Sequence, residues 1–236
     1  MKLPKITQDF ITKMKDDAKK GAYRIELDGI SIDVYEYVFP PSSPFSESTH
    51  TVYEQFGDLS GKKVLDMGTG TGILAIQAAL AGAESVDAID ICGKSIECAI
   101  HNVKINGLEN KVKVYWSNLF RMVPREKKYD LIISNPPILD LDPDENITDE
   151  KGIPLCDDSR FVSLIDPGFR YHKELFREVP KYLNPNGRIV LCHADLQEDG
   201  FEKLEKIASE AGFEFGVLQS VSSLGYEWRN YEFFLK

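Results

Sequence analysis

The chain has 236 residues, of which 42% are hydrophobic, and a formal net charge of −10 at pH 7. Its length allows one large α/β domain with an extension or two small domains, and its apolar content excludes a wholly disordered chain. The acidic balance disfavours a nucleic-acid binder, which normally presents a basic surface, and favours proteins or small molecules as partners.

The cysteines and the N-terminal residues bear on compartment. The four cysteines, Cys92, Cys98, Cys156 and Cys192, form no Cys-x-x-Cys pair, so we expect free thiols in a reducing cytoplasm and no metal site. Residues 1–20 are mixed polar and charged and lack the apolar core of a signal peptide. No run elsewhere is long enough to span a bilayer, so we expect no membrane partner. The sequence leaves the oligomeric state unknown.

The first 48 residues predict an N-terminal extension made of a helix and a β-hairpin. The helix is expected over residues 7–20, with Thr7 or Asp9 as its cap. Two β-rich segments, at 23–27 and 30–38, are joined by Asp-Gly, a strong hairpin turn signal. A proline-rich linker follows at 39–45.

From residue 49 onward, helical and strand patterns alternate. This alternation predicts an α/β fold with a doubly wound, mostly parallel seven-stranded sheet and helices on both faces. Helices are expected at 49–56, 73–80, 94–106, 171–183 and 201–211, and strands at 64–66, 85–90, 112–115, 130–134, 188–192, 213–219 and 227–234. The last two strands are expected to pair antiparallel.

Three alternate glycines, Gly68, Gly70 and Gly72, follow the first strand of this series. In doubly wound sheets, ligands bind beyond the carboxyl ends of the strands, and glycine lets the backbone approach them closely. Asp90, at the end of the next strand, is placed to accept hydrogen bonds from ribose hydroxyls. The spacing Gly-x-Gly-x-Gly differs from that of dinucleotide sites. Asp66 would also repel a pyrophosphate, so we expect an ammonium or sulfonium ligand.

A second motif, Asn135-Pro136-Pro137-Ile138, follows the strand at 130–134. The side-chain oxygen of Asn135 and the backbone carbonyl of Pro136 offer two acceptors for the hydrogens of an NH2 group. The prolines stiffen the turn and remove competing donors. We therefore assign a catalytic role to Asn135 and Pro136, which would orient a weakly nucleophilic nitrogen.

Together the two motifs resemble a known family. Residues 66–72 resemble the first motif of class I S-adenosylmethionine-dependent methyltransferases, and Asn135-Pro136-Pro137 resembles the fourth motif of their Asn-Pro-Pro-Tyr subgroup. That subgroup includes release-factor glutamine methyltransferases and RNA and DNA base N-methyltransferases. The resemblance covers about residues 38–190, and the paired motifs are specific. It implies a Rossmann-like methyltransferase fold, S-adenosylmethionine as cofactor, and a catalytic domain over residues 49–236.

The resemblance also implies roles for individual residues. Asp66 would orient the glycine loop and meet the methionine end of the cofactor, Asp90 would hold its ribose, and Ile91 would pack on its adenine. Asn118 would receive the adenine amino group through its carbonyl oxygen, where the family often has Asp. The cofactor-binding residues are thus predicted to be Asp66, Gly68, Thr69, Gly70, Gly72, Asp90, Ile91, Asn118, Leu119 and Asn135.

The acceptor side is less sharply defined. The family commonly has Tyr or Phe at position 138, which stacks on a planar substrate. Ile138 therefore weakens the case for a nucleobase and favours an aliphatic side chain or a small metabolite. The predicted substrate-binding residues are Pro137, Ile138, Phe45, Thr49 and His193.

Other polar residues have simpler interpretations. We expect His101 to be a surface or packing residue of its helix, whereas His172 could either meet substrate or lie in a helix turn capped by Asp166. The acidic segment 140–158 is interpreted as a solvated loop, with electrostatic selection of a cationic peptide or amine as the alternative.

These observations predict a methyltransferase acting on an amide or amino nitrogen of a protein side chain or small metabolite. The first alternative is an RNA or DNA base methyltransferase, which would need a basic groove. The second is a cofactor-binding partner subunit without catalysis. A nicotinamide-dependent oxidoreductase is disfavoured by the glycine spacing.

Overall fold

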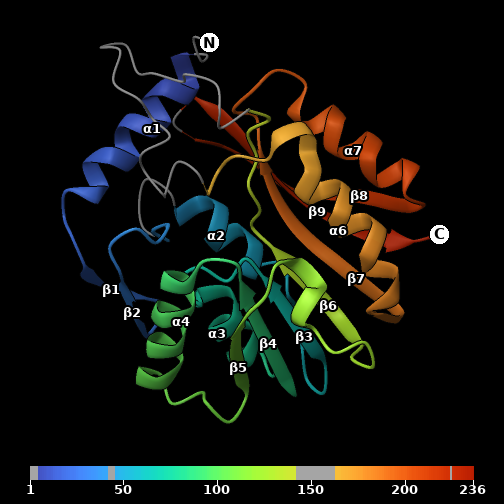
Figure 1. The fold of residues 1–236 in the computed structure, drawn as a ribbon, viewed down its shortest axis with the longest axis horizontal. Coiled ribbons are helices and arrows are strands. Elements are labelled where there is room, and N and C mark those ends of the chain that lie inside the picture. Colours follow the sequence, from blue (N-terminus) through green and yellow to red (C-terminus); the bar gives the residue numbers. More distant parts are fainter. Residues whose placement is uncertain (1–4, 42–45, 142–162, 224) are drawn as a thin grey trace.

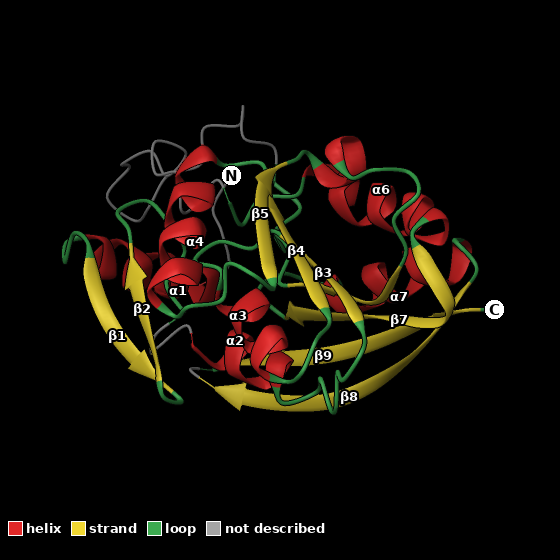
Figure 2. Cartoon of the chain, turned by 90° about the horizontal axis from the view of Figure 1, so that it is seen from below, coloured by secondary structure: helices red, strands yellow, loops and turns green. Residues whose placement is uncertain are grey.

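A seven-stranded sheet flanked by helices forms the centre of the computed structural model, which describes residues 5–41, 46–141, 163–223 and 225–236 (Figures 1 and 2). The strand order is β5-β4-β3-β6-β7-β9-β8. Strand β9 runs antiparallel to β7 and β8, and the remaining neighbours are parallel. The predicted doubly wound, mostly parallel sheet is confirmed. Its strands are β3 (Lys63–Met67), β4 (Ser85–Asp90), β5 (Val112–Trp116), β6 (Tyr129–Ser134), β7 (Leu183–Ala194), β8 (Phe213–Ser223) and β9 (Tyr226–Leu235).

The helices cover both faces of this sheet. They are α1 (Lys5–Ala18), α2 (Ser46–Tyr53), α3 (Ile73–Leu80), α4 (Gly93–Ile105), α6 (Arg170–Glu178) and α7 (Gly200–Glu210), with short 3-10 turns at Leu119–Met122, Pro167–Phe169 and Val179–Lys181. Successive strand residues alternate between the two faces. Val64 accordingly packs with α1 to α4 in one hydrophobic cluster, and Leu65 packs with α6 and α7 in the other.

The N-terminal hairpin forms from β1 (Tyr23–Leu27) and β2 (Ile30–Val34), so its second strand ends at Val34 rather than at residue 38. Asp28 and Gly29 have φ angles of 50° and 82°, as the tight hairpin turn requires. Side chains of α1 and β2 pack in the same hydrophobic cluster as α3, so no separate core among the described residues marks off the N-terminal extension. The division of the chain into two parts at residue 48 stays a prediction.

The first two helices are shifted from the sequence-based expectation, to 5–18 instead of 7–20 and to 46–53 instead of 49–56. Helix α1 already includes Lys5, so neither Thr7 nor Asp9 is its cap. The Thr7 hydroxyl instead donates to the Leu196 carbonyl at 2.5 Å, which ties α1 to the loop after β7. Helix α2 ends at Tyr53 rather than at residue 56.

The helix expected over 171–183 ends early, and residues 184–187, which we expect from the sequence to form a turn before the strand at 188–192, lie inside a strand. Helix α6 ends at Glu178 because Pro180, in the following 3-10 turn, has no N–H to continue the helical hydrogen bonds. Strand β7 already begins at Leu183, and residues 184–187 form an irregularity within it, between the pairs Tyr129–Leu183 and Leu131–Arg188.

Neither a membrane-spanning helix nor a metal cluster is found within the described ranges. No helix among them is long and apolar enough to cross a bilayer. No group of three or more His, Cys, Asp or Glu side chains in those ranges is arranged to hold a metal ion. Cys92, Cys98 and Cys192 are free thiols.

The β7 irregularity predicts an unequal response to two Gly→Ala substitutions. A Cβ at Gly187 would lie 2.9 Å from the Asn184 carbonyl and 3.0 Å from that of Tyr129, so Gly187→Ala should destabilise the protein by about 1–3 kcal/mol. At Gly216 in β8 the nearest atom would be 3.7 Å away, so Gly216→Ala should be tolerated. Urea unfolding measures both, and equal losses of stability would contradict this account of the strand.

Candidate active site

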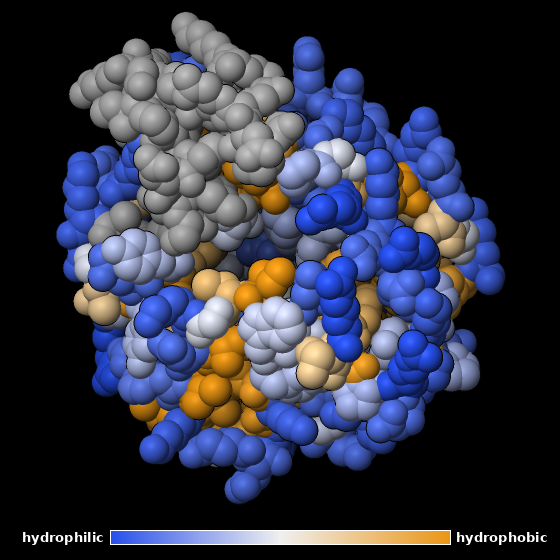
Figure 3. All heavy atoms as spheres, in the orientation of Figure 1, coloured by the Kyte–Doolittle hydropathy of each residue, from blue (hydrophilic) through white to orange (hydrophobic). Residues whose placement is uncertain are grey.

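A cavity of about 920 Å³ lies at the carboxyl ends of β3, β4 and β6, the size of a site for a small molecule or cofactor. Figure 3 shows a hollow near the middle of this face, with apolar side chains along part of its border. Twelve of the predicted site residues line the cavity: Thr49, Gly68, Thr69, Gly70, Asp90, Ile91, Asn118, Leu119, Asn135, Pro136, Pro137 and Ile138. The sheet therefore brings the two sequence motifs to one place.

The glycine loop keeps its backbone open toward the cavity. Gly68 and Gly70 have φ angles of 79° and 55°, which side chains rarely adopt, and no atom lies within 4 Å of a Cβ built there. The N–H groups of Gly68 and Thr69 both donate to the Ile89 carbonyl at 2.9 Å. The loop is thus fastened to β4 and leaves space where a ligand can approach the chain.

Asp66 lies beneath this loop and does not line the cavity. Its Oδ2 accepts hydrogen bonds from the Thr69 hydroxyl at 2.6 Å and from the Ala75 N–H at 3.1 Å. Its Oδ1 is buried without a partner among the described residues. Burial raises the pKa of this carboxyl to about 7. Asp66 therefore holds the loop from beneath and does not itself face the cavity.

Asp90 does line the cavity, and it also shapes the loop. One carboxylate oxygen accepts from the Gly70 N–H at 3.0 Å, and the other accepts from the Cys92 N–H at 2.8 Å. Burial raises the pKa of Asp90. Because each carboxylate oxygen has two acceptor positions, Asp90 keeps capacity for a hydroxyl donor in the cavity.

The wall beyond Asp90 is largely apolar. Ile91 lines the cavity although 60% of it is exposed, and its carbonyl accepts from the Trp116 indole N–H at 2.8 Å. Leu119 lines the same wall with a φ angle of 48°, and its carbonyl accepts from the Ser117 hydroxyl at 2.5 Å. Such a wall suits a flat, mostly apolar group such as a purine.

On the opposite side, Asn135 is held by a contact from α2. Its side-chain nitrogen donates to the Ser48 hydroxyl at 3.2 Å, and Ser48 is 1% exposed. With the nitrogen engaged there, the amide oxygen of Asn135 remains as an acceptor at the cavity. Ser48 was not predicted from the sequence.

The prolines and Ile138 are fixed by the chain that returns after residue 162. The N–H groups of Ile138 and Leu139 both donate to the Leu164 carbonyl, at 2.9 and 2.8 Å. Ile138 is 2% exposed and packs in the cluster with α3. The turn is therefore held by backbone hydrogen bonds on the side away from Asn135.

Tyr171 is a second lining residue that the sequence did not single out. Its hydroxyl lies 2.7 Å from Ser134 Oγ, which donates to the Met67 carbonyl at 3.0 Å. The Asp166 carboxylate accepts from the N–H groups of Tyr171 and His172 at 2.6 and 3.4 Å, so it caps the first turn of α6 as one of our interpretations expected. This network joins the ends of β3 and β6 to α6.

Some predicted residues lie elsewhere. His193 does not line the cavity; it is fully buried against Phe169, His172 and Phe201. It shares a face of β7 with Leu191, and α7 covers that face, so the predicted contact with substrate has no geometric support. Gly72 lies behind the lining residues, where a Cβ would be 3.1 Å from that of Ala99. Phe45 and residues 142–158 of the acidic segment fall outside the described ranges.

Other lining residues carried no recognisable signal in the sequence. Tyr37, Phe39 and Pro41 follow the hairpin, Arg121 follows β5, and Arg170 and Glu174 lie on α6. They reach the cavity because separate elements converge on the same edge of the sheet.

Comparison with known proteins shows that the chain is similar to methyltransferases. A family model described as ribosomal protein L11 methyltransferase (PrmA) matches residues 49–146. A putative protein N5-glutamine methyltransferase of Methanocaldococcus jannaschii is 28% identical over 78% of this chain and 86% of its own length.

Two further relatives are longer proteins. A release factor glutamine methyltransferase of Fusobacterium nucleatum is 29% identical over 70% of this chain and 46% of its own length. A ribosomal protein uL3 glutamine methyltransferase of Bradyrhizobium diazoefficiens is 30% identical over 77% of this chain and 60% of its own length. The chain thus spans only about half of these two relatives.

Solved structures share the fold. A methyltransferase from Pyrococcus furiosus superposes with a TM-score of 0.61 and 20% identity, covering 96% of each chain. A ribosomal protein L11 methylase from Lactobacillus delbrueckii superposes with a TM-score of 0.55 and 22% identity, over 82% of this chain and 80% of the other.

The environment of Asp66 predicts a pH dependence of stability. Its pKa is raised from 3.8 to about 7, so between these values the folded protein binds a proton that the unfolded chain has lost. Its contribution to the free energy of unfolding is therefore largest below about pH 4 and falls, by up to about 4 kcal/mol, as the pH rises through about 7.

Asp66→Asn provides the comparison, since the amide oxygen can accept both hydrogen bonds and the side chain does not titrate. Urea unfolding at pH 5 and pH 8, without any ligand, should show a steeper loss of stability with rising pH in the parent protein. Equal slopes for the two proteins would disprove the raised pKa.

Proposed function

We infer that this chain, an S-adenosylmethionine-dependent methyltransferase with the Rossmann-like fold, methylates the side-chain amide nitrogen of a glutamine in a protein. One observation carries the proposal: the Asn135-Pro136-Pro137 turn and the glycine loop line the same cavity. The names of the relatives, which are protein glutamine methyltransferases, support the choice of acceptor. The acceptor remains our proposal, because the chain spans only part of two of them.

The cavity fits S-adenosylmethionine on three counts. The loop leaves open space at Gly68 and Gly70, Asp90 presents a carboxylate for ribose hydroxyls, and Ile91 and Leu119 offer an apolar wall for adenine. Asn118 would accept from the adenine amino group, and Thr69 lines the loop between the two open glycines. The bound cofactor supplies a methyl group already activated on a sulfonium, so the protein has mainly to position the acceptor.

The Asn135 turn supplies that positioning. An amide nitrogen is a weak nucleophile because its lone pair is delocalised into the carbonyl. The Asn135 side-chain oxygen and the Pro136 carbonyl would accept from its two hydrogens, hold its plane and favour its pyramidal form as it attacks. Ser48 sustains this by engaging the Asn135 nitrogen, which keeps the oxygen available as acceptor. With the cofactor bound, the nitrogen would bond to the methyl carbon as the carbon–sulfur bond breaks, and the amide would lose one proton to water.

The surroundings of the turn favour a glutamine over a base. Ile138 supplies an aliphatic contact where a stacking ring would serve a nucleobase, and it is held rigidly by the core. The net charge of −10 opposes binding to a polyanion. An RNA or DNA base is therefore the weaker candidate for the methyl acceptor. A small amino metabolite is also weaker, because the relatives are named as methyltransferases of proteins. We place the reaction in the cytoplasm, in keeping with the free thiols of Cys92, Cys98 and Cys192 in the described part of the chain.

The acceptor can be tested directly. The protein is incubated with methyl-labelled S-adenosylmethionine and separated protein, RNA and small-molecule fractions of its source cells, with release factors and ribosomal proteins examined individually. We expect label in protein, on a glutamine side chain located by tandem mass spectrometry, and none after that glutamine is changed to Glu. Label confined to RNA or to small molecules would refute the proposed acceptor.

Asn135→Ala separates positioning from cofactor binding. Loss of one acceptor of the transition state should lower kcat on the order of a hundredfold. The dissociation constant for S-adenosylhomocysteine should change less than about twofold, since the loop and Asp90 are untouched.

Ser48→Ala tests the same turn with a smaller expected effect than Asn135→Ala. It keeps the Asn135 oxygen but frees its orientation, so kcat should fall roughly fivefold, equivalent to about 1 kcal/mol. Unchanged kcat in Asn135→Ala would remove this turn from the mechanism.

A further inference from the structure

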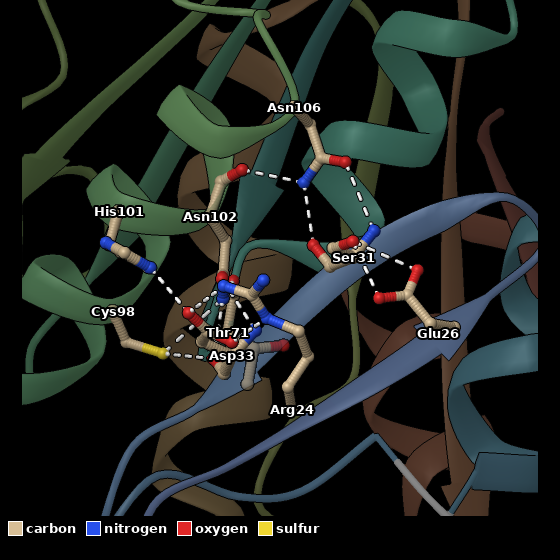
Figure 4. Close-up of polar contacts among 9 residues, drawn as sticks. All are labelled: Arg24, Glu26, Ser31, Asp33, Thr71, Cys98, His101, Asn102 and Asn106. Atoms are coloured by element: carbon tan, nitrogen blue, oxygen red, sulfur yellow. Dashed lines mark hydrogen bonds and ion pairs between the residues drawn. The ribbon is translucent and has the colours of Figure 1, made fainter.

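On the edge of β2 that faces away from β1, two asparagine side chains satisfy the backbone N–H and C=O groups that a third strand would otherwise pair with. Asn102 lies on α4 and Asn106, four residues later, caps its C-terminus, a rise of about 6 Å along the helix axis. Ser31 and Asp33 lie two residues apart on β2, a span of about 6.6 Å. Because the two repeats match, each asparagine meets one backbone position of the strand (Figure 4).

The contacts reproduce those of a neighbouring strand. Asn102 accepts from the Asp33 N–H at 2.8 Å and donates to the Asp33 carbonyl at 2.9 Å. Asn106 accepts from the Ser31 N–H at 3.3 Å and donates to the Ser31 carbonyl at 2.8 Å. These two asparagines therefore dock the hairpin onto α4.

The two asparagines differ in their remaining contact. Asn102 Nδ2 also donates, at 2.8 Å, to the carbonyl of Thr71, which lies between Gly70 and Gly72 of the cofactor loop. Asn106 Nδ2 donates instead to the carbonyl of Asn102 on its own helix. Asn102 is fully buried, so its amide is held where it can reach both the hairpin and the loop.

The hairpin in turn leads into the cavity. Tyr37, Phe39 and Pro41, in the segment that follows β2, line it. On the outer side of β2, Asp33 pairs with Arg24 at 2.6 Å and with His101 of α4 at 2.7 Å. The position of β2 therefore sets the position of one wall of the cavity.

We propose that Asn102 is a positioning residue that couples docking of the β1–β2 hairpin to the conformation of the cofactor loop. A ligand that fixes the loop then also favours the docked hairpin, and by linkage the docked hairpin strengthens binding of that ligand. The cavity wall formed by Tyr37, Phe39 and Pro41 is thereby completed when the cofactor is present. This coupling rests on the cofactor site and is independent of the identity of the acceptor.

The test uses S-adenosylhomocysteine, whose binding requires no acceptor. Its dissociation constant is measured by calorimetry for the parent protein, Asn102→Ala and Asn106→Ala, and exchange of the Ser31 amide hydrogen is followed by NMR with and without it. Asn106→Ala is the matched control, because it loses contacts to the hairpin but none to the loop.

We expect Asn102→Ala to weaken binding roughly fivefold or more. Asn106→Ala should change it less than about twofold. In the parent protein S-adenosylhomocysteine should slow exchange at Ser31, and in Asn102→Ala this slowing should disappear. Asn102→Asp, which keeps the acceptor for the Asp33 N–H and loses both donors, should behave like Asn102→Ala and replaces it if that variant does not fold.

Equal effects of the Asn102 and Asn106 variants on binding would overturn the proposal. So would unchanged exchange at Ser31 in the parent protein on saturation with S-adenosylhomocysteine, a result that needs no variant. Failure of the parent protein to bind S-adenosylhomocysteine at all would instead refute the proposed function.

Discussion

A buried carboxylate, that of Asp66, ties the glycine loop after β3 to the first turn of α3, and hydrogen bonds to β4 complete the fastening of the loop on which the cavity depends. Asp66 Oδ2 accepts from Thr69 within the loop and from Ala75 in the first turn of α3. The loop thereby keeps a conformation in which the space beside Gly68 and Gly70 is free of side chains and opens toward the cavity. Burying a carboxyl group is costly, as its raised pKa shows, and the protein accepts that cost at the position where the loop needs an acceptor.

Parallel pairing then brings the other functional groups to the same edge. Met67 pairs with Ile89 on one side and with Ser134 on the other, so Asp90 at the end of β4 and the residues after β3 and β6, Gly68 and Asn135, emerge at the same edge of the sheet. Methyl transfer needs an electrophile and a nucleophile in line at short distance. Because the sheet places the ends of β3, β4 and β6 side by side, the cofactor site and the acceptor site lie next to each other without further rearrangement of the chain.

The sequence predicted the cavity-lining residues that belong to short local motifs. It missed the residues whose contacts are with parts of the chain distant in sequence. The cavity-lining positions of Gly68, Asp90 and Asn135 could be predicted because each lies at the end of a strand within a recognisable motif, and their roles stay predictions. The Ser48 contact joins residues 87 apart, and nothing local to either one signals it. His193 was misplaced because a strand-end position was taken to face the ligand, whereas the alternation along β7 turns it under α7. The role of Asn102 could not be predicted either, because in the sequence it is an ordinary polar helix residue. Its contacts become visible only in the structure, where β2 lies beside α4.

A crystal structure of the protein with S-adenosylhomocysteine tests the central claim most directly. The account predicts the ligand in the cavity between the glycine loop and the Asn135 turn, with its ribose hydroxyls on the Asp90 carboxylate and its adenine against Ile91 and Leu119. A ligand bound outside this cavity, or a cavity closed by side chains when the ligand is present at saturation, would contradict it.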